Sequence, residues 1–583
     1  MAKKGLKRKF NDEEENRKDY LSYHSVRLYS ATDIPVTQAA KSKNDFVPPS
    51  ALWADFDPTD EPLNAERLEE SGNYTRFSFL AASYPDGNLS AEIRAYTPPY
   101  YARKAVLLIG ERDALPQQEV IDEIVERVGA YVFVVDYNGI GEDSATLFPP
   151  SLFYGKRGNE GDRDRKFGSS PKDTCPYVYT LILRRAVAFI KTNFPKTELA
   201  VVGIRDGVEL AMAVAGLERK NVMALGCLCA CGYKEFAPFP KYPHAEEHFD
   251  LKKMSFIVSL SGVSHLKKYP HPVFCAVGSN GTYSDVDRLS SLKALIAAPL
   301  TLSVTPQFSD NVGRESFDCF LSWLNQSFWG SDFPAPPVTT VDVNRDGTVY
   351  ADVTATATPA LKGAILHYSY NDNNHHTRVW NSVACETVGV GQYLAKMTFT
   401  KPAGYLYFYT EASYLNGAVS TETPKFLDMS SYRLALSPAK NTAVLFRYGA
   451  EGLIVAESKQ PILLTDAVEE KSVPAGVKGA ICNDGALLLY VKEAFSATRS
   501  DRILQVDSFK EGPNYDLEVV ARLQSGAVYR AIKRVAATTN FVSTQFTLTD
   551  FKDDKYLPLP EWADVATLTV VTPGIAVNKI TFI

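Results

Sequence analysis

The sequence predicts an α/β domain with a mostly parallel sheet, followed by two all-β sandwich domains. Between residues 74 and 328, short apolar runs typical of buried strands alternate with amphipathic helical segments. A Pro- and Gly-rich segment, WGSDFPAPPV, interrupts this pattern at residues 329–338 and marks a domain boundary. After it, apolar and polar residues alternate with a period of two, as in strands that bury one face.

The α/β region opens with two alternating segments, residues 75–84 and 89–99, which predict an antiparallel lead-in. The near-continuous apolar runs, predicted to be strands buried on both faces, are residues 104–110, 131–139, 198–204, 222–232, 271–280 and 299–306. Helical spacing of apolar residues predicts helices over residues 117–129, 180–194, 208–217 and 314–328. This order predicts a sheet with helices on both faces, in a domain of residues 46–330.

The two β regions differ in length. Residues 338–428 have the length and the turn-separated strands of an immunoglobulin-like β-sandwich. Residues 430–583 are longer and fit a jelly-roll β-sandwich. Residues 1–45 are polar and of mixed charge, which predicts an N-terminal arm: a solvated tail, a segment that docks on a neighbouring subunit, or a basic address signal.

Composition excludes several functional classes. A net charge of −6 gives no concentrated basic surface, so we expect no nucleic-acid partner. No apolar run approaches the ~18 residues of a membrane span, and no signal peptide is visible. The eight cysteines include no CxxC pair, which predicts no metal site and a reducing, cytoplasmic location. Cys227, Cys229 and Cys231 alternate, and we expect their thiols on one face of a buried strand.

One junction carries a recognisable pattern of chemistry. Gly203 and Gly207 flank the segment Ile204-Arg205-Asp206 between a predicted strand and a predicted helix. In a G-x-S-x-G elbow, such glycines allow a strained turn that holds a nucleophilic serine above the sheet. Three further segments, each with a strand-like run and a polar turn, accompany this elbow-like pattern. They are VVDYNGIGED (134–143), PVFCAVGSNGTYSD (272–285) and PLTLSVTPQFSDN (299–311).

These segments resemble the α/β-hydrolase superfamily, in particular its acetyl-xylan-esterase-like and PhoPQ-pathogenicity-related-like members, which carry a β extension. The resemblance covers roughly residues 45–428. It implies a serine at the elbow, an acid after the strand of segment 272–285, a histidine in the last loop, and a His-Gly pair in the oxyanion loop.

The sequence departs from the family at all four places. Arg205 occupies the nucleophile position, and Gly281 stands near the acid position. The loop that should offer the histidine contains Ser309, Asp310 and Asn311 instead. The oxyanion loop reads Ile109-Gly110-Glu111. These departures predict a degenerate site without catalytic residues, cofactor or metal.

Two interpretations of Asp206 stay open. Asp206 could serve as a nucleophile offset by one position, with Asp285 or Asp287 as the acid and His265 or His271 approaching from elsewhere. Alternatively, Arg205 and Asp206 form a local ion pair or cap the following helix, because a carboxylate is favoured near a helix N-terminus.

Other polar clusters have simpler interpretations. His375 and His376 lie in a predicted surface hairpin, where neighbouring strand residues point to opposite faces. His244 and His248 lie in a Pro-rich segment that we interpret as a lid or interface loop, and residues 154–173 read as a surface loop. The last domain contains QFTLTDF (545–551), EWADVATLTVV (561–571) and the ending NKITFI (578–583), and on these segments it weakly resembles carbohydrate-binding jelly rolls. The candidates for sugar contacts are Tyr515, Tyr529 and Tyr556, whereas we expect Trp562 in the core.

The sequence therefore predicts a catalytically inactive protein with a hydrolase fold and a structural, self-assembly or ligand-binding role. Its expected partners are further copies of itself, in a homo-oligomer, and a carbohydrate ligand. The alternative is a divergent serine-type hydrolase that acts on carbohydrate esters or small acyl esters.

Overall fold

The computed structural model describes residues 47–429 with gaps, strand segments between residues 444 and 490, and residues 500–583 with a short gap. The largest internal gaps before residue 430 are residues 153–169 and 234–257, and the predicted N-terminal arm lies outside the described residues. The chain divides into two compact units. One comprises residues 1–276, 283–303 and 318–335, and the other residues 277–282, 304–317 and 336–583.

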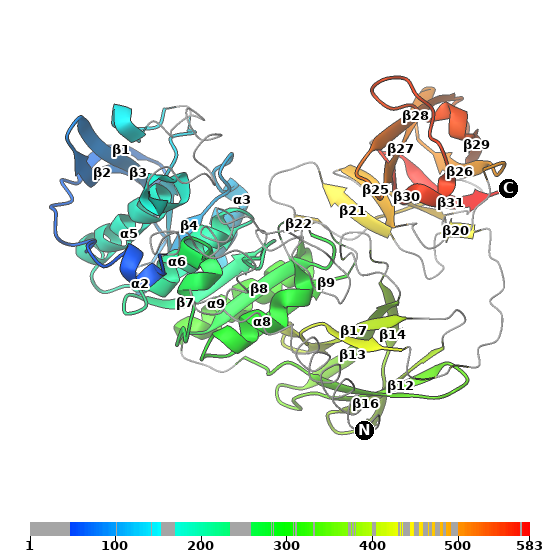
Figure 1. Cartoon of the computed structure of the whole chain (residues 1–583), viewed down its shortest axis with the longest axis horizontal. Coiled ribbons are helices and arrows are strands. Elements are labelled where there is room, and N and C mark those ends of the chain that lie inside the picture. The colour runs from blue at the N-terminus through cyan, green and yellow to red at the C-terminus, as the bar shows by residue number, and fades with distance from the viewer. Residues whose placement is uncertain are drawn as a thin grey trace, which may run out of the picture. The chain divides into compact units, whose positions relative to one another are not determined.

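A nine-stranded mixed sheet forms the α/β part of the chain (Figure 1). Its strands are β1 (Glu66–Ser71), β2 (Tyr74–Tyr84), β3 (Gly87–Tyr96), β4 (Lys104–Ile109), β5 (Tyr131–Asp136), β6 (Glu198–Ile204), β7 (Val222–Leu228), β8 (Val273–Gly278) and β9 (Leu300–Thr305). They lie in the order β1-β2-β3-β5-β4-β6-β7-β8-β9. The pairings β1–β2, β2–β3 and β3–β5 are antiparallel, and those from β5 through β4, β6 and β7 to β8 are parallel. The sheet is thus mixed, with β1 as an additional edge strand that the sequence pattern did not predict.

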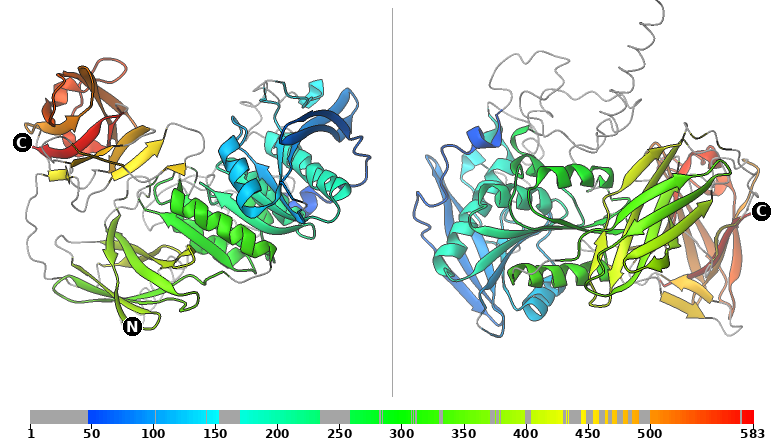
Figure 2. Two further views of the ribbon diagram at one scale, coloured as in Figure 1. Left: turned by 180° about the vertical axis from the view of Figure 1, so that it is seen from behind. Right: turned by 90° about the horizontal axis from the view of Figure 1, so that it is seen from below.

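Helices cover both faces of this sheet (Figure 2). They are α2 (Pro49–Leu52), α3 (Gln118–Glu123) with the π-helical turn η2 (Ile124–Val128), α5 (Cys175–Asn193), α6 (Gly207–Leu217), α8 (Leu289–Leu295) and α9 (Arg314–Phe328), with the 3₁₀ turns η3 (Pro150–Leu152), η5 (Pro171–Asp173), η7 (Gly262–His265) and η8 (Val286–Arg288). Residues 105–109 of β4 are fully buried, which explains why the strand reads as a continuous apolar run. Among the described helices, none is long and apolar enough to cross a membrane.

The prediction for the cysteines of β7 was wrong in part. The strand ends at Leu228, and Cys229 adopts a left-handed backbone conformation with φ of 63°. The period-two alternation therefore stops after Cys227, and the three thiols do not share one strand face. All three side chains are nevertheless buried, as expected for small apolar groups.

Residues 338–429 form two antiparallel sheets around a shared core. One sheet has the order β11-β12-β16-β15 and the other the order β14-β13-β17-β18, with β19 also paired to β17. The strands are β11 (Val338–Val343), β12 (Thr348–Thr354), β13 (Leu361–Tyr370), β14 (Asn381–Ala384), β15 (Glu386–Gly389), β16 (Gln392–Thr398), β17 (Tyr405–Tyr414), β18 (Val419–Thr421) and β19 (Lys425–Asp428). Val349 and Met397 of the first sheet share the core with Leu366 and Phe408 of the second.

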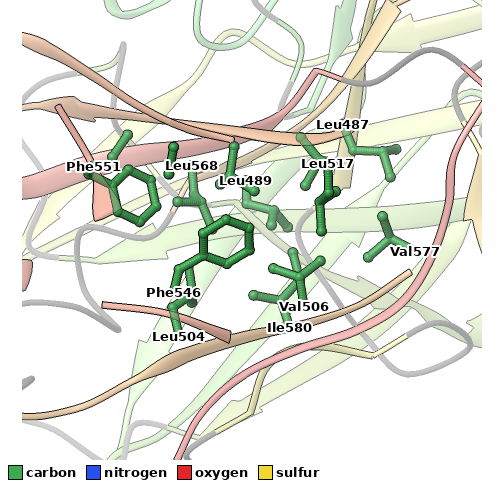
Figure 3. Packing of buried hydrophobic residues seen from close by; sticks show 14 of the residues in the cluster. Leu487, Leu489, Leu504, Val506, Leu517, Phe546, Phe551, Leu568, Val577 and Ile580 are labelled. Atoms are coloured by element: carbon green, nitrogen blue, oxygen red, sulfur yellow. The ribbon is translucent and has the colours of Figure 1, made fainter. Parts of the chain in front are cut away.

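The C-terminal region also packs two antiparallel sheets face to face. Their orders are β23-β24-β31-β26-β29, with β20 paired to β31, and β21-β25-β30-β27-β28; a separate parallel pair joins β10 to β22. The strands are β10 (Val312–Gly313), β20 (Val444–Arg447), β21 (Ile454–Ser458), β22 (Leu464–Thr465), β23 (Glu469–Ser472), β24 (Lys478–Ile481), β25 (Gly485–Tyr490), β26 (Leu504–Phe509), β27 (Tyr515–Leu523), β28 (Val528–Val535), β29 (Val542–Phe546), β30 (Val565–Val570) and β31 (Ala576–Phe582), with the 3₁₀ turns η10 (Leu548–Asp550) and η11 (Trp562–Asp564). Val506, Phe546 and Ile580 of one sheet face Leu517 and Leu568 of the other (Figure 3).

Candidate functional site

The junction between β6 and α6 is a tight turn centred on Arg205. This residue has φ of 48°, a left-handed conformation that is costly for a side chain with a Cβ. A Cβ on Gly203 would lie 2.5 Å from the carbonyl oxygen of Gly207, and one on Gly207 would lie 2.4 Å from that of Gly110. Both contacts are with main-chain atoms, so only glycine fits at either position. The structure thus places Arg205 at the apex of a strained strand-to-helix turn, where a hydrolase holds its serine.

The side chain of Arg205 forms an ion pair with Glu111. Its Nη1 lies 3.0 Å from Oε1 of Glu111, and the two side chains are only 9% and 12% exposed. The ring of Tyr283 lies 6.0 Å from the guanidinium carbon. The apex of the turn is therefore occupied by a cation that a nearby carboxylate holds in place.

Burial raises the pKa of Glu111 to about 6, against the opposing effect of Arg205, while the charges of Asp206 and Asp113 raise it further. Glu111 is therefore an acid–base group that titrates near neutral pH. From the sequence, Glu111 was expected only as a departure from the family pattern in the oxyanion loop, without a role of its own. The strand register explains why Glu111 lies beside Arg205. Ile109 of β4 pairs with Gly203 of β6, so the residues that follow these two strands lie next to each other.

Asp206 stands at the N-cap of α6. Its backbone is helical, with φ of −57°, and its side chain makes no capping hydrogen bond. Asp206 therefore occupies the capping position of α6 without a capping hydrogen bond from its side chain. Its position still favours a negative charge, because the peptide dipoles of α6 point their positive end toward it.

The Arg205–Glu111 pair lies where the sheet changes its direction of winding. From β4 the chain crosses to β5 on one side, whereas from β6 it crosses to β7 on the other. In open α/β sheets, ligands bind outside the carboxyl ends of the strands at such a switch point. The pair therefore occupies the position at which this kind of sheet offers a binding site.

The loop after β8, which should offer the catalytic acid, is tied to residues of the β13–β14 connection. The Nδ2 group of Asn280 donates to the main-chain carbonyls of His375 and Arg378, at 2.8 and 2.7 Å. Nε2 of His375 lies 3.2 Å from the carbonyl oxygen of Gly281. Gly281 itself brings no carboxylate, and the polar groups beside it are engaged in holding this loop.

Asp285 and Asp287, the two other candidates for the catalytic acid, are buried near the start of α8. Oδ2 of Asp285 accepts a hydrogen bond from Nε of Arg288 at 3.0 Å. This contact is an i,i+3 ion pair inside one turn, which gives Asp285 a local structural role.

The two candidate histidines lie at the far end of α6 from Arg205. A Cβ on Gly216 would lie 2.2 Å from the carbonyl oxygen of His265, which fixes His265 beside the last turn of that helix. Nine residues separate Gly207 from Gly216, a helical rise of about 14 Å. His271 is bonded through Nε2 to the carbonyl of Arg219, which lies beyond the end of α6. The structure does not bring either ring to the elbow.

Several further candidates fall outside the described residues. They are Ser309 and Asn311 of the last loop, His244 and His248, His376, and most of the loop at 154–173. Asp310 is described and half-buried in the loop after β9. Across the described residues, no group of three or more His, Cys, Asp and Glu side chains could hold a metal ion.

The tyrosines proposed for sugar contacts have different surroundings. Tyr515 is buried and its hydroxyl bonds to that of Ser508, while Tyr529 packs against the same core. Only Tyr556 is largely exposed, in the turn that follows Asp553. The buried ring of Tyr515 is thus unsuited to stack on a sugar, and that of Tyr529 is partly exposed. Trp562 is fully buried, which confirms the expectation that it belongs to the core.

Comparison with known proteins gives structural neighbours only. No protein-family model and no curated protein match the sequence. The chain is similar to acetyl xylan esterase 1 from Thermoanaerobacterium sp. JW/SL YS485, at 12% identity over 46% of this chain and 88% of the esterase, with a TM-score of 0.34. It is also similar to an acetyl xylan esterase from Paenibacillus sp. R4, at 12% identity over 46% and 90% of the two chains and a TM-score of 0.35. A third similar structure is Est1E from Butyrivibrio proteoclasticus with ferulic acid bound, at 14% identity over 41% and 93% of the two chains and a TM-score of 0.30.

All three likenesses combine a low sequence identity with a low TM-score. Likeness of this degree assigns no activity to the present chain.

Proposed function

We propose that the chain is an α/β-hydrolase-fold protein whose elbow has lost serine chemistry and serves a structural or ligand-binding role. The observation that carries this proposal is the ion pair between Arg205 and Glu111 at the apex of the strained turn. A guanidinium stays protonated at all physiological pH values and has no nucleophilic atom. An attacking oxygen is therefore missing at the one place where the turn would present it.

The remaining parts of a serine mechanism point the same way. His265 and His271 are held near the far end of α6, and the loop at Asn280 and Gly281 is held by main-chain contacts with His375 and Arg378. A base must lie within hydrogen-bond reach of the group that it deprotonates. We infer that the domain serves binding or assembly. A hydrolase fold is compatible with this role, because a fold does not by itself determine a function.

The proposal extends to the two β regions. We propose that residues 338–428 form an immunoglobulin-like sandwich and residues 430–583 a jelly-roll sandwich, both serving contacts with further copies of the chain or with a carbohydrate. The mass of the purified protein in solution, measured by light scattering, tests self-association. A monomer at all concentrations would contradict it.

A divergent hydrolase is the second candidate, and one feature of the site favours it besides the titles of the neighbours. Glu111 has a pKa of about 6 because of its burial, close to the value that suits a general base at neutral pH. In that case Glu111 would activate a water molecule, and Arg205 would stabilise the negative charge that develops on the ester oxygen.

An esterase assay with a matched variant separates the two candidates. We expect purified protein to hydrolyse neither short-chain acyl esters nor acetylated xylan above a heat-treated blank. Turnover that disappears in Glu111→Gln would instead support the second candidate. Glu111→Gln keeps the size of the side chain and removes its acid–base function, so it isolates the chemistry from the packing.

A further inference from the structure

A pocket of about 350 Å³ lies in the α/β part of the chain, at the C-terminal end of α6. Residues 48–50 around the start of α2, residues 216–219 at the end of α6, and the η7 region contribute its lining. Because the elbow is at the opposite end of α6, this pocket is separate from the Arg205–Glu111 site. We call it the α6 pocket.

The walls of the α6 pocket are largely apolar. Pro48, Pro49, Leu217 and Val258 supply side chains without hydrogen-bonding groups. The volume is within the range of small-molecule sites, which starts near ~300 Å³. At about 30 Å³ for each water-sized atom, the pocket admits a compact molecule of about a dozen non-hydrogen atoms.

Two cations line the same pocket. The guanidinium of Arg219 is oriented by hydrogen bonds from Nε to the carbonyl of Gly216, at 2.9 Å, and from Nη2 to that of His265, at 3.3 Å. Lys267 also contributes to the lining and is exposed. None of the ion pairs between described residues includes Arg219 or Lys267, and none of the described lining residues is acidic.

The other titratable group of the lining adds no charge. Nε2 of His265 accepts a hydrogen bond from Nε1 of Trp53 at 3.3 Å, so its proton is on Nδ1, which lies 3.1 Å from the carbonyl of Ser261. Burial lowers the pKa of this ring to about 4, and the ring is neutral at physiological pH. Arg219 and Lys267 therefore set the charge of the pocket.

From this combination we propose that the α6 pocket binds a small organic anion that has a compact apolar body and one carboxylate or similar acidic group. The apolar body fills the space between Pro49, Leu217 and Val258, where its burial supplies most of the affinity. The acidic group lies against Arg219 and Lys267, which present charge-assisted donors. This activity is independent of the elbow and of its chemistry.

The test uses 1-naphthoate, an aromatic carboxylate of suitable size, titrated into the full-length protein by calorimetry. We expect saturable binding at one site with a dissociation constant between about 10 μM and 1 mM, typical of a ligand this small. The uncharged analogue 1-naphthalenemethanol should bind about tenfold more weakly, because it cannot pair with the cations. Equal binding of the two compounds would overturn the proposal, as would no binding of either.

Variants locate the binding and control for folding. Lys267→Gln removes an exposed charge and should weaken 1-naphthoate binding several-fold, while Leu217→Trp should abolish binding by filling the pocket. Arg534→Gln removes an exposed arginine of β28 and should leave binding unchanged. Binding that survives Leu217→Trp, with a thermal melting curve like that of the wild type, would place the ligand elsewhere and overturn the proposal.

The chain itself offers a competing occupant. Residues 12–15 read Asp-Glu-Glu-Glu and precede the lining residues Pro48 and Pro49 in the sequence. A full-length variant with these four acids changed to their amides should bind 1-naphthoate as the wild type does. If only the variant binds, the cations of the pocket serve the chain's own acidic segment, and the small-molecule proposal is wrong.

Discussion

The carboxylate of Glu111 and the guanidinium of Arg205 meet at 3.0 Å because β4 and β6 are adjacent parallel strands. Each residue lies one or two positions beyond the carboxyl end of its strand. The pair thus occupies the switch point of the sheet, the position at which open α/β sheets bind their ligands. The turn is tight and strained, and an ion pair occupies its apex.

Stability should respond sharply to Gly207→Ala. The added methyl carbon would lie 2.4 Å from the carbonyl oxygen of Gly110, and main-chain atoms cannot move aside without shifting β4. We expect a loss of about 3 kcal/mol or more in the free energy of unfolding, measured by urea denaturation. Gly363→Ala is the control, because a Cβ there meets nothing within 4 Å. Similar losses for the two variants would contradict the close packing of the elbow.

The Glu111 carboxyl should make the protein less stable as pH rises. Its pKa is raised from 4.5 to about 6 in the folded state, chiefly by burial, so the folded chain binds this proton more tightly than the unfolded chain. Stability from this group falls by about 2 kcal/mol as pH rises from about 4.5 to 6 and is constant above that range. The difference between the unfolding free energies of wild type and Glu111→Gln, measured from pH 4 to 8, should show this step. A difference that does not vary with pH would contradict the assignment.

His265 should make the protein more stable as pH rises, which is opposite to the effect of Glu111. Burial lowers its pKa from 6.5 to about 4, so the unfolded chain binds this proton more tightly. The stability that it contributes is present above pH 6.5 and is lost, by about 3 kcal/mol, as pH falls toward 4. His265→Gln should flatten this part of the profile, although it also removes the acceptor for Trp53. His271→Gln, at the same end of α6, should leave the acid-side slope in place; loss of the slope in that variant instead would show that the wrong histidine was assigned.

The loop after β8 should tolerate Asn280→Ala better than Asn280→Asp. The amide of Asn280 donates to the carbonyls of His375 and Arg378, and the side chain is 1% exposed. Alanine leaves these buried carbonyls without that donor, at a cost of about 1–3 kcal/mol, whereas aspartate adds a carboxylate that faces two acceptors. Thermal unfolding should rank the variants in that order, with the exposed Asn540→Asp close to wild type. An Asn280→Asp protein as stable as the wild type would show that the loop is not held in this way.

Local sequence patterns predicted strands β2 to β9 and helices α3, α5, α6 and α9, but not β1, α2 or α8. The apolar run at 198–204 and the helix that begins beside it coincide with β6 and α6, because strands buried on both faces leave an unmistakable pattern. The early end of β7 could not be predicted in the same way. Cys229 adopts a positive φ that its residue type does not announce.

The site could be predicted only in part for a related reason. The glycines at 203 and 207 mark the elbow in the sequence, but the partner of Arg205 depends on which strands lie side by side. The contacts of Asn280 span 95 and 98 residues of sequence and leave no local signal. The partners of Arg205 and of Asn280 are both determined by which distant segments the fold brings together, and local composition does not indicate this.

The central claim is that no nucleophile remains at the elbow, and labelling with a fluorophosphonate probe tests it most directly. Intact-mass measurement should show unlabelled wild-type protein under conditions that fully label an authentic serine hydrolase. Arg205→Ser should also stay unlabelled, because no histidine among the described residues is held beside the turn to activate the new serine. Stoichiometric labelling of the wild-type protein would contradict the claim that the elbow holds no nucleophile. The modified residue would then identify the nucleophile.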